Sequence, residues 1–425
     1  MNAQTLPLPV GILRRVAARA GTPAFVYFVD PMRARVRALG EAFAGRFDVS
    51  YAIKSNPNVA LLRALRGPLA WLDASSAGEI ARGIEAGYAP GRIAFSGPAK
   101  REVEVAYALD VGCGDIVCES LRQVELVDRL ARERGRSQAI LLRINPTEVP
   151  RRFGLHMGGR PSQFGIDEEQ VDDVVAAATR MPGVRLEGLH VYSAGNSLDE
   201  DAIADNVAII ADLFARVVDR HALRPSRLVF GSGFGIPYFD EDRELDLQRL
   251  AARIVPTVDR LKAVPAVADA RLVLEMGRWL VGVDGYMLTS VVDAKSSRGT
   301  EIRLCDAGFN NHLSACGMMG TVMRRNWRFW NLSRPDAPPA GPVLLAGPLC
   351  ASFDVLGTGV HLPVTEPGDV IVVGSSGAYG PTASPTRFIS HPAPREILVD
   401  EAAGTEDDVT EWTAGSPEPV SAGGR

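Results

Sequence analysis

Short apolar segments alternate with longer amphipathic segments between residues 47 and 278. In the longer segments, apolar residues recur at helical spacing, as at Val124 and Val127 behind the N-cap candidate Ser120. Eight strand–helix units over this length predict an α/β fold, a (β/α)8 TIM barrel, with a doubly wound open sheet as the alternative. The predicted strands are Phe47–Ile53, Leu69–Ala74, Arg92–Ser96, Asp115–Glu119, Ala139–Ile144, Leu186–Tyr192, Arg227–Phe230 and Arg271–Glu275.

The pattern changes after residue 280, where β-rich segments are separated by Gly and Pro. These segments predict a second, all-β barrel domain, and residues 295–300 are typical of a hairpin turn. We expect the TIM barrel to span residues 25–280 and the β domain to combine residues 1–24 with 281–400. Residues 401–425 are expected to form an acidic disordered tail. The predicted β segments are Tyr286–Ala294, Glu301–Asp306, Pro342–Ala346 and Asp369–Val373.

Composition and charge narrow the class of protein. Apolar residues make up 46% of the chain and charged residues 23%, which is typical of a soluble enzyme. Residues 401–425 contain six acidic residues and one basic residue, which accounts for the net charge of −5. The rest of the chain is nearly neutral, which argues against a protein that binds nucleic-acid phosphates. The sequence has no signal-peptide pattern, no apolar run of about 18 residues and no C-x-x-C pair. It predicts a cytoplasmic protein without a membrane span, disulfides or a metal site.

One lysine stands where a nucleophilic amine would be useful. Lys54 follows the apolar segment 49–53, and desolvation there disfavours the ammonium form and suits Schiff-base chemistry. The chain has only four lysines, and Lys100, which also follows a predicted strand, is the one rival. Because polar residues at the carboxyl ends of barrel strands face the active site, Lys54 is a candidate catalytic residue.

A glycine-rich turn suggests a phosphate site. Residues 231–235 read Gly-Ser-Gly-Phe-Gly after a predicted strand, and Gly277 and Arg278 follow the next strand. An amine together with a phosphate cradle predicts pyridoxal 5′-phosphate (PLP). Glu275 then supplies the anionic partner that the pyridine nitrogen needs. His190 is expected to stack on the ring, or else to be a hydrogen-bonded core histidine.

Ten segments occur in the order found in one enzyme family, which the chain resembles over residues 20 to 395. They are Tyr51–Pro57, Asp73–Glu79, Phe95–Lys100, Arg143–Pro146, Gln163–Gly165, Gly188–His190, Gly231–Gly235, Glu275–Arg278, Gly347–Asp354 and Gly377–Tyr379. The family is that of the fold-type III PLP-dependent decarboxylases, which includes diaminopimelate, ornithine and biosynthetic arginine decarboxylases. The resemblance implies an alanine racemase-like PLP barrel, a C-terminal β domain, and a homodimer with shared active sites.

The resemblance also implies roles for individual residues. Lys54 resembles the lysine that carries PLP, His190 the residue stacked on its ring and Glu275 the partner of its nitrogen. Cys350 and Asp354 resemble residues that reach the neighbouring subunit's site, where the cysteine donates a proton; a buried small hydrophobe is the alternative for Cys350. The remaining implied cofactor contacts are Asp73, Arg143, Gly233, Gly235, Gly277, Arg278 and Tyr379.

Departures from the family pattern bear on the substrate. Ala351 stands where diaminopimelate decarboxylases have a glutamate, and Ser314 and Met318 replace an arginine and a tyrosine. A distal charge on the substrate would then be buried without a partner, which disfavours diaminopimelate. Residues 310–317 and 324–326 resemble a branch of specialised metabolism that decarboxylates conjugated or carrier-bound amino acids. The predicted substrate-binding residues are Asp354, Ser314, His312 and Arg325.

The sequence therefore predicts a PLP-dependent carboxy-lyase acting on an amino acid or an amino-acid conjugate. An acyl-carrier protein is a possible partner, because Arg324, Arg325 and Arg328 form a basic segment; a plain solvated loop is the alternative. Three other functions stay open. They are a diaminopimelate- or ornithine-type decarboxylase of a free diamino acid, a PLP-dependent racemase, and a non-catalytic PLP-binding paralogue. Glu275 argues against the racemase, because alanine racemase-like enzymes place an arginine at the pyridine nitrogen.

Overall fold

The computed structural model describes residues 8–150, 155–156, 158–317 and 325–411. The chain divides into two compact units, each of which is described separately. One unit contains the described residues of 33–236 and 243–280. The other contains those of 1–32, 237–242 and 281–416.

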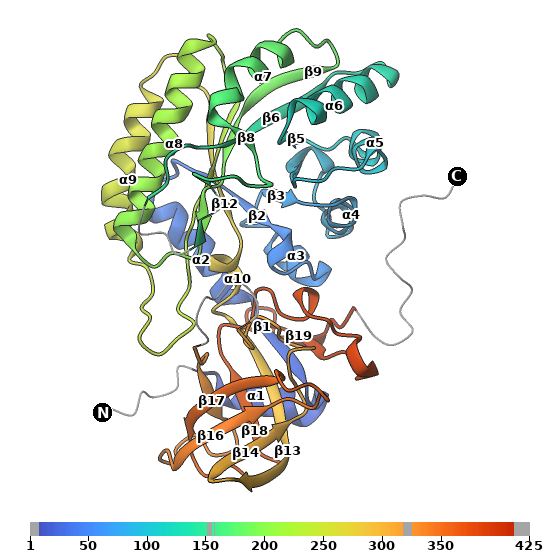
Figure 1. Cartoon of the computed structure of the whole chain (residues 1–425), viewed down its shortest axis with the longest axis vertical. Helices are drawn as coiled ribbons and strands as arrows, with labels where there is room; N and C mark the ends of the chain where they lie inside the picture. Colours follow the sequence, from blue (N-terminus) through green and yellow to red (C-terminus); the bar gives the residue numbers. More distant parts are fainter. Residues whose placement is uncertain (1–7, 151–154, 157, 318–324, 412–425) are drawn as a thin grey trace. The chain divides into compact units, whose positions relative to one another are not determined.

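The first unit is a closed parallel barrel (Figure 1). Its strands pair in the order β5-β4-β3-β2-β12-β11-β9-β6, and pairing of β5 with β6 closes the ring. The barrel is thereby confirmed over the open sheet, because an open sheet would leave two unpaired edges. The strands of the barrel are β2 (Asp48–Ala52), β3 (Trp71–Ala74), β4 (Ile93–Phe95), β5 (Asp115–Cys118), β6 (Gln138–Asn145), β9 (Val184–Val191), β11 (Arg227–Gly231) and β12 (Arg271–Met276).

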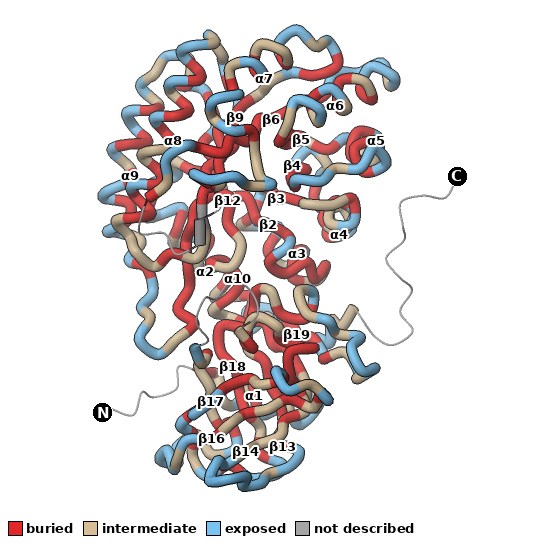
Figure 2. The backbone as a smooth tube through the Cα atoms, in the orientation of Figure 1, coloured by how far each residue is buried: buried red, intermediate tan, exposed pale blue. Residues whose placement is uncertain are grey.

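Helices surround these strands and turn their apolar faces inward (Figure 2). In α6, for example, Ser120 accepts a hydrogen bond from the backbone of Gln123, which caps the helix, while Val124 and Val127 are buried. The helical elements are α2 (Val29–Ala42), η1 (Ile53–Ser55), α3 (Val59–Leu65), α4 (Ala77–Glu85), η2 (Pro90–Arg92), α5 (Glu102–Val111), α6 (Leu121–Glu133), η3 (Glu168–Gln170), α7 (Val171–Ala178), α8 (Glu200–Arg220), α9 (Leu247–Lys262) and α10 (Arg278–Val281). Three short strands, β7 (Leu155–His156), β8 (Ile166–Asp167) and β10 (Ala194–Gly195), lie in its loops.

The second unit is the predicted all-β domain. Its mixed sheet runs β17-β16-β14-β13-β1-β19-β20, with β18 pairing β13 and β15. The predicted hairpin turns at Arg298 and Gly299, whose φ angles of 51° and 80° match a two-residue turn between β13 and β14. The elements are α1 (Val10–Ala20), β1 (Ala24–Phe28), β13 (Gly285–Ser297), β14 (Thr300–Cys305), β15 (Phe329–Asn331), β16 (Gly341–Ala346), β17 (Val355–Leu362), β18 (Val370–Val373), η4 (Pro381–Ala383), η5 (Phe388–Ser390), β19 (Arg395–Asp400) and β20 (Thr405–Asp408).

The structure differs from the predicted bounds in two places, at the start of the barrel and at the start of the C-terminal tail. Strand β1 pairs with β13 and β19, so residues 25–28 belong to the β domain, not to the barrel. Disorder from residue 401 onward is wrong for β20, which pairs with β19. The acidic strand is stabilised by basic partners, because Arg15 contacts Glu406 at 2.8 Å and Arg395 contacts Asp408 at 3.0 Å. The rest of the predicted tail, residues 412–425, lies outside the described residues.

Within the described part of the chain, no helix combines the length and the apolar character that crossing a lipid bilayer requires.

Candidate active site

Four predicted site residues lie together at the carboxyl ends of barrel strands. Lys54 is in the turn η1 after β2, and a hydrogen bond from the Tyr51 hydroxyl to the carbonyl of Asn56 closes this turn (3.0 Å). Nζ of Lys54 lies 3.9 Å from Oε1 of Glu275, and 45% of the lysine side chain is exposed. The other carboxylate oxygen of Glu275 is 2.8 Å from Nε2 of His190. The barrel thus brings Lys54, His190 and Glu275 into one cluster, with Asp73 buried at its inner end.

The pKa values of the two buried carboxyl groups, Asp73 and Glu275, are shifted in opposite directions. Burial alone would raise the pKa of Glu275, but the hydrogen bond from His190 and the charges of Lys54 and Arg143 outweigh it and lower that pKa. Burial, together with repulsion by Glu275, raises the pKa of Asp73 well above its ordinary value. The surroundings thus favour the charged form of Glu275 and disfavour the charged form of Asp73.

His190, for which ring stacking stays a prediction, lies in the barrel interior beside Glu275. Only 2% of its surface is exposed, and its Nε2 is engaged by Glu275 inside the barrel. Tyr192, two residues later and just beyond the end of β9, presents its ring 5.8 Å from Nζ of Lys54. His190 and Tyr192 are two positions apart, so both side chains lie on the inner face of the sheet. The sequence predicted that this strand ends at Tyr192, and that position was the signal that could have identified Tyr192 as a site residue.

The glycine-rich turn after β11 is closely packed at its glycines, and its one large side chain, Phe234, is buried against Trp279. Gly233 has a φ angle of +70°, and its carbonyl accepts a hydrogen bond from the backbone of Ser197 at 2.9 Å. A Cβ at Gly235 would come within 2.8 Å of the backbone of Asn196, so a larger residue would displace the chain there. Gly277, which follows β12, is likewise packed against Ser55. Backbone groups can therefore approach a ligand closely, as a phosphate cradle requires.

The predicted residues on neighbouring strands are held by other partners. Nη1 of Arg143 contacts both carboxylate oxygens of Glu119, at 3.2 and 3.3 Å, and this carboxylate also accepts a hydrogen bond from the backbone of Gly165. Nζ of Lys100 donates to the carbonyl of Gly97 at 2.6 Å and to Gln123 at 3.3 Å. The structure therefore favours Lys54 over Lys100 as the reactive amine, because the rival amine is bound by carbonyl groups.

These features fit PLP as far as the barrel is concerned. Lys54 offers an amine, Glu275 an anion for a pyridine nitrogen and Tyr192 an aromatic face. The glycines of the turn 231–235 offer backbone groups for a phosphate. Arg278 begins α10 directly after Gly277. Tyr379, the remaining predicted phosphate contact, belongs to the β-domain unit.

In the β domain, the Cys350 loop is fixed by Asp354. Cys350 itself is exposed, whereas Asp354 is buried and accepts hydrogen bonds from the backbones of Phe309 and Leu349, both at 2.8 Å. Both carboxylate oxygens of Asp354 are thus engaged and hold the loop, and its contact with substrate stays a prediction. The alternative of a buried Cys350 is wrong.

The other predicted substrate contacts are also engaged within the β domain. His312 is fully buried between the rings of Phe25 and Trp327, and burial lowers its pKa to about 3. Ser314 donates to the carbonyl of Tyr379 at 3.2 Å, which brings these two predicted residues together. Arg325 contacts Glu241 at 2.7 Å and lies 3.9 Å from the ring of Phe239. Met318 and Arg324 lie outside the described residues.

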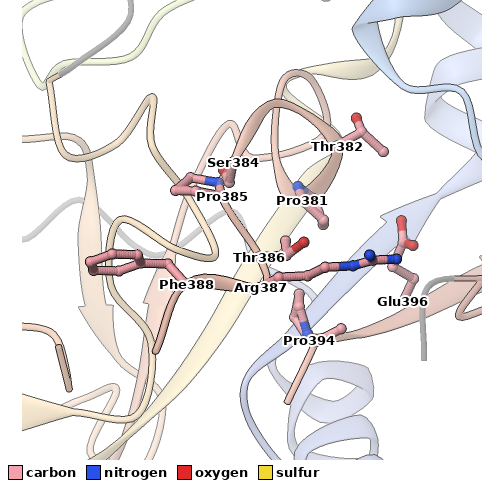
Figure 3. A pocket seen from close by; sticks show the side chains of 10 residues that line it. Pro381, Thr382, Ser384, Pro385, Thr386, Arg387, Phe388, Pro394 and Glu396 are labelled. Carbon is pink, nitrogen blue, oxygen red and sulfur yellow. The ribbon is translucent and has the colours of Figure 1, made fainter. Parts of the chain in front are cut away.

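A cavity of about 590 Å3 lies within the β domain (Figure 3). The side chain of Arg387 points toward Glu396 there, and Phe388 points away from it. Hydroxyl groups, prolines and these charged residues line the cavity, and the described lining residues include no lysine, cysteine or histidine. It therefore offers no nucleophile or amine for PLP chemistry, and the barrel cluster remains the candidate active site.

Comparisons with known proteins identify the family. The pyridoxal-binding domain of pyridoxal-dependent decarboxylases matches residues 29–282, and their C-terminal sheet domain matches residues 191–377. The chain is 30% identical over 403 residues to the L-glutamyl-(BtrI acyl-carrier protein) decarboxylase of Niallia circulans, covering 92% of this chain and 93% of the relative. It is 28% identical to the 2-((L-alanin-3-ylcarbamoyl)methyl)-2-hydroxybutanedioate decarboxylase of Staphylococcus aureus, covering 90% and 95%.

Diaminopimelate decarboxylases are also similar. The enzyme of Methanothermobacter thermautotrophicus is 33% identical, covering 91% of this chain and 88% of the relative. A crystal structure of the Helicobacter pylori enzyme complexed with L-lysine superposes with a TM-score of 0.84 at 25% identity, covering 95% of this chain and 97% of that one. The chain therefore belongs to the pyridoxal-dependent decarboxylases, and it is a PLP-dependent lyase.

Proposed function

We propose that this decarboxylase removes the α-carboxylate of an amino acid whose distal group is conjugated, including one tethered to a carrier protein, in specialised metabolism in the cytoplasm. The names of two relatives support this class, because one acts on a glutamyl group on an acyl-carrier protein and the other on an alanine-derived carbamoyl conjugate. Ser314 and Ala351 are uncharged where we expect the diaminopimelate enzymes to carry charge, so a free distal charge would lack partners here.

The observation that carries the reaction type is the anionic state of Glu275. A carboxylate at the pyridine nitrogen keeps the nitrogen protonated and the ring a strong electron acceptor. The hydrogen bond with His190 and the nearby charge of Lys54 maintain that charge here against the effect of burial. Decarboxylation is favoured over racemisation, in which an arginine at this position would weaken electron withdrawal. The presence of both Lys54 and Cys350 also argues against a non-catalytic paralogue.

Each of these residues has a separate role in the proposed reaction. PLP, when bound, supplies the acceptor for the electron pair of the Cα–carboxylate bond as carbon dioxide leaves. Lys54 provides the amine that holds the cofactor until the substrate amine takes its place. Glu275 would hold a proton at the pyridine nitrogen of the cofactor, and Tyr192 would offer it an aromatic face. Cys350 or Lys54 then donates a proton to Cα, which replaces the lost carboxylate.

The carrier protein is the less supported form of the conjugate. An acidic carrier would need unpaired basic side chains on the enzyme. Arg325 is paired with Glu241, and Arg328 donates to the carbonyls of Phe239 and Asp242. Both described arginines of the basic segment are therefore engaged within the chain. The proposal accordingly rests on a conjugated amino acid more than on a carrier protein.

A homodimer with shared sites is part of the proposal. In the β domain, Phe353, Phe388 and Ile389 are 52%, 44% and 46% exposed, and the first two rings pack on Phe309. Large apolar groups exposed together are typical of a surface that another subunit covers. Cys350 is exposed three residues before Phe353, so a second copy seated there would receive the proton-donating thiol.

Replacing Lys54 tests the assignment of the amine. In Lys54→Ala, we expect loss of the absorbance band near ~420 nm that a protonated PLP–lysine adduct gives, together with loss of carbon dioxide release. Lys295→Ala, in the exposed hairpin, should keep both signals. Absorbance spectra and a carbon dioxide assay decide the assignment. A band that survives in Lys54→Ala and disappears in Lys100→Ala would transfer the role to Lys100.

Coexpression of two inactive variants tests the shared site. If a barrel uses the Cys350 of the other copy, mixed dimers of Lys54→Ala and Cys350→Ala contain one intact site of two. The purified mixed dimer should then have about half of wild-type activity per dimer. Differently tagged copies, purified in tandem and assayed for carbon dioxide, provide the measurement. Inactive mixed dimers would show that Cys350 acts within its own chain, and a monomer in sedimentation would refute the dimer.

A substrate panel tests the proposed conjugate. The panel comprises free diaminopimelate, ornithine and glutamate, a glutamyl thioester of a small thiol, and glutamyl-loaded acyl-carrier protein. We expect kcat/KM for a conjugate to exceed that for free diaminopimelate by about 10²-fold, because a free distal charge would be buried unpaired. Equal rates for the small thioester and the loaded carrier would remove the carrier protein as a partner. Preference for free diaminopimelate would overturn the proposed substrate class.

A further inference from the structure

The loop that carries Cys350 also presents an exposed aromatic ring. Phe353 is 52% exposed, and the exposed Cys350 lies three residues before it. The backbone N–H of Asp354 donates to the carbonyl of Ala351 at 3.1 Å, which closes a turn with Ser352 and Phe353 at its tip. The thiol and the ring therefore belong to one short turn, so a surface that meets the thiol meets the ring as well.

Contacts with the rest of the β domain hold this ring in place. The rings of Phe353 and Phe309 are 5.0 Å apart, and the backbone of Phe309 donates to the buried carboxylate of Asp354 at 2.8 Å. The backbone N–H of Val355, the first residue of β17, donates to the carbonyl of Phe353 at 2.9 Å. Because the ring is already ordered, a ligand that packs on it loses little conformational entropy.

The surface beside this ring is apolar. Ala351 and Ser352 carry no charge, and Phe388 and Ile389 are 44% and 46% exposed. The ring of Phe388 packs on the same Phe309, at 5.6 Å. A free carboxylate or ammonium group would lose hydration against such a surface without gaining a partner there. An uncharged, planar acyl linkage can instead pack on an aromatic face.

The charged side chains next to this surface are directed elsewhere. Figure 3 shows the side chain of Arg387 pointing toward Glu396, whereas Phe388 points away from it. His391 acts on the carboxyl group of Asp354, which is itself buried. These contacts leave the apolar character of the exposed ring unchanged.

We propose that Phe353 is a specificity-determining residue that packs against the uncharged acyl linkage of a conjugated substrate. The inference rests on the proposed function, in which Cys350 enters the neighbouring subunit's site and donates a proton to Cα. A turn that brings the thiol to Cα also brings the ring of Phe353 to the part of the substrate beyond Cα. An amide, ester or thioester at the distal end is therefore favoured over a free carboxylate.

Binding of two product-like amines tests the proposal without turnover. 4-Aminobutanoate has a charged distal end, and its N-propyl amide has an uncharged linkage at the same position. Both amines compete with Lys54 for the cofactor, so their Kd values follow from changes in the absorbance band near ~420 nm. We expect the wild type to bind the amide about tenfold more tightly than the acid. Phe353→Ala should lose most of this preference.

Two further variants separate this role from general damage to the domain. Phe353→Leu keeps an apolar group at the tip of the turn and should keep part of the preference for the amide. Val364 is a matched control, because it is 54% exposed and lies beyond the other end of β17. Val364→Ala should bind both amines as the wild type does. Sedimentation of each variant checks that its oligomeric state is unchanged.

Mixed dimers test whether Phe353 acts in the neighbouring subunit's site. In one preparation, Lys54→Ala and Phe353→Ala are on separate chains, and in the other they are on the same chain. Each mixed dimer retains one Lys54. If the ring acts across the dimer, this site receives Phe353 in the first preparation alone, so the preference for the amide should survive there and be lost in the second. The opposite result would overturn the inference, because the ring would then act within its own chain.

The remaining outcomes distinguish this inference from the proposed function. A wild type without preference for the amide would overturn the inference even if Phe353→Ala fails to fold. An equal loss of affinity for both amines in Phe353→Ala would also overturn it, because the ring would then serve only the shape of the loop. If the preference depends on Phe353 but free diaminopimelate is the best substrate of the panel, the role of the ring stands and the proposed substrate class falls.

Discussion

The charge on Glu275 is the constraint around which the barrel site is built. A carboxylate buried without compensation costs several kcal/mol, so the fold must bring positive or hydrogen-bonding partners to it. Those partners come from separate strands, namely His190 from β9 and Lys54 from the turn after β2. Direct pairing of β12 with β2 and β11, and of β11 with β9, holds these strands in register. The parallel register of four neighbouring strands thus brings the partners of Glu275 to the same end of the sheet.

The features that the sequence predicted correctly are those with a local signal. The eight barrel strands follow from apolar segments that end in polar residues, and Lys54 and Glu275 follow from their positions at such ends. The sequence carries no local signal of how deep inside the barrel a side chain lies. His190 and Tyr192 alternate onto the same face, and only the observed end of β9 at Val191 separates the interior residue from the one at the mouth. Tyr192 was therefore not identified from the sequence, and the stacking role of His190 stays a prediction.

Partners distant in sequence explain the other differences. The basic side chains of Arg325 and Arg328 suggested a docking surface, but residues 239–242 neutralise them from more than 80 positions away. In the same way, Arg15 and Arg395 stabilise the acidic strand β20, which composition alone predicted to be disordered. Asp354 lies in a matching motif, yet its contact with the backbone of Phe309 assigns it to loop geometry. Composition and motif spacing do not encode such pairings.

A barrel of this kind does not by itself determine the reaction. A racemase and a decarboxylase can share the amine, the glycine turn and the aromatic face, since each needs the same cofactor in the same place. What separates them is whether the group beside the pyridine nitrogen holds negative charge. Here the buried carboxylate of Glu275 is in hydrogen-bond contact with His190 and lies near Lys54, and these partners lower its pKa against the effect of burial. The surroundings of Glu275 therefore favour negative charge at this position of the barrel, which is the state that a decarboxylase requires there.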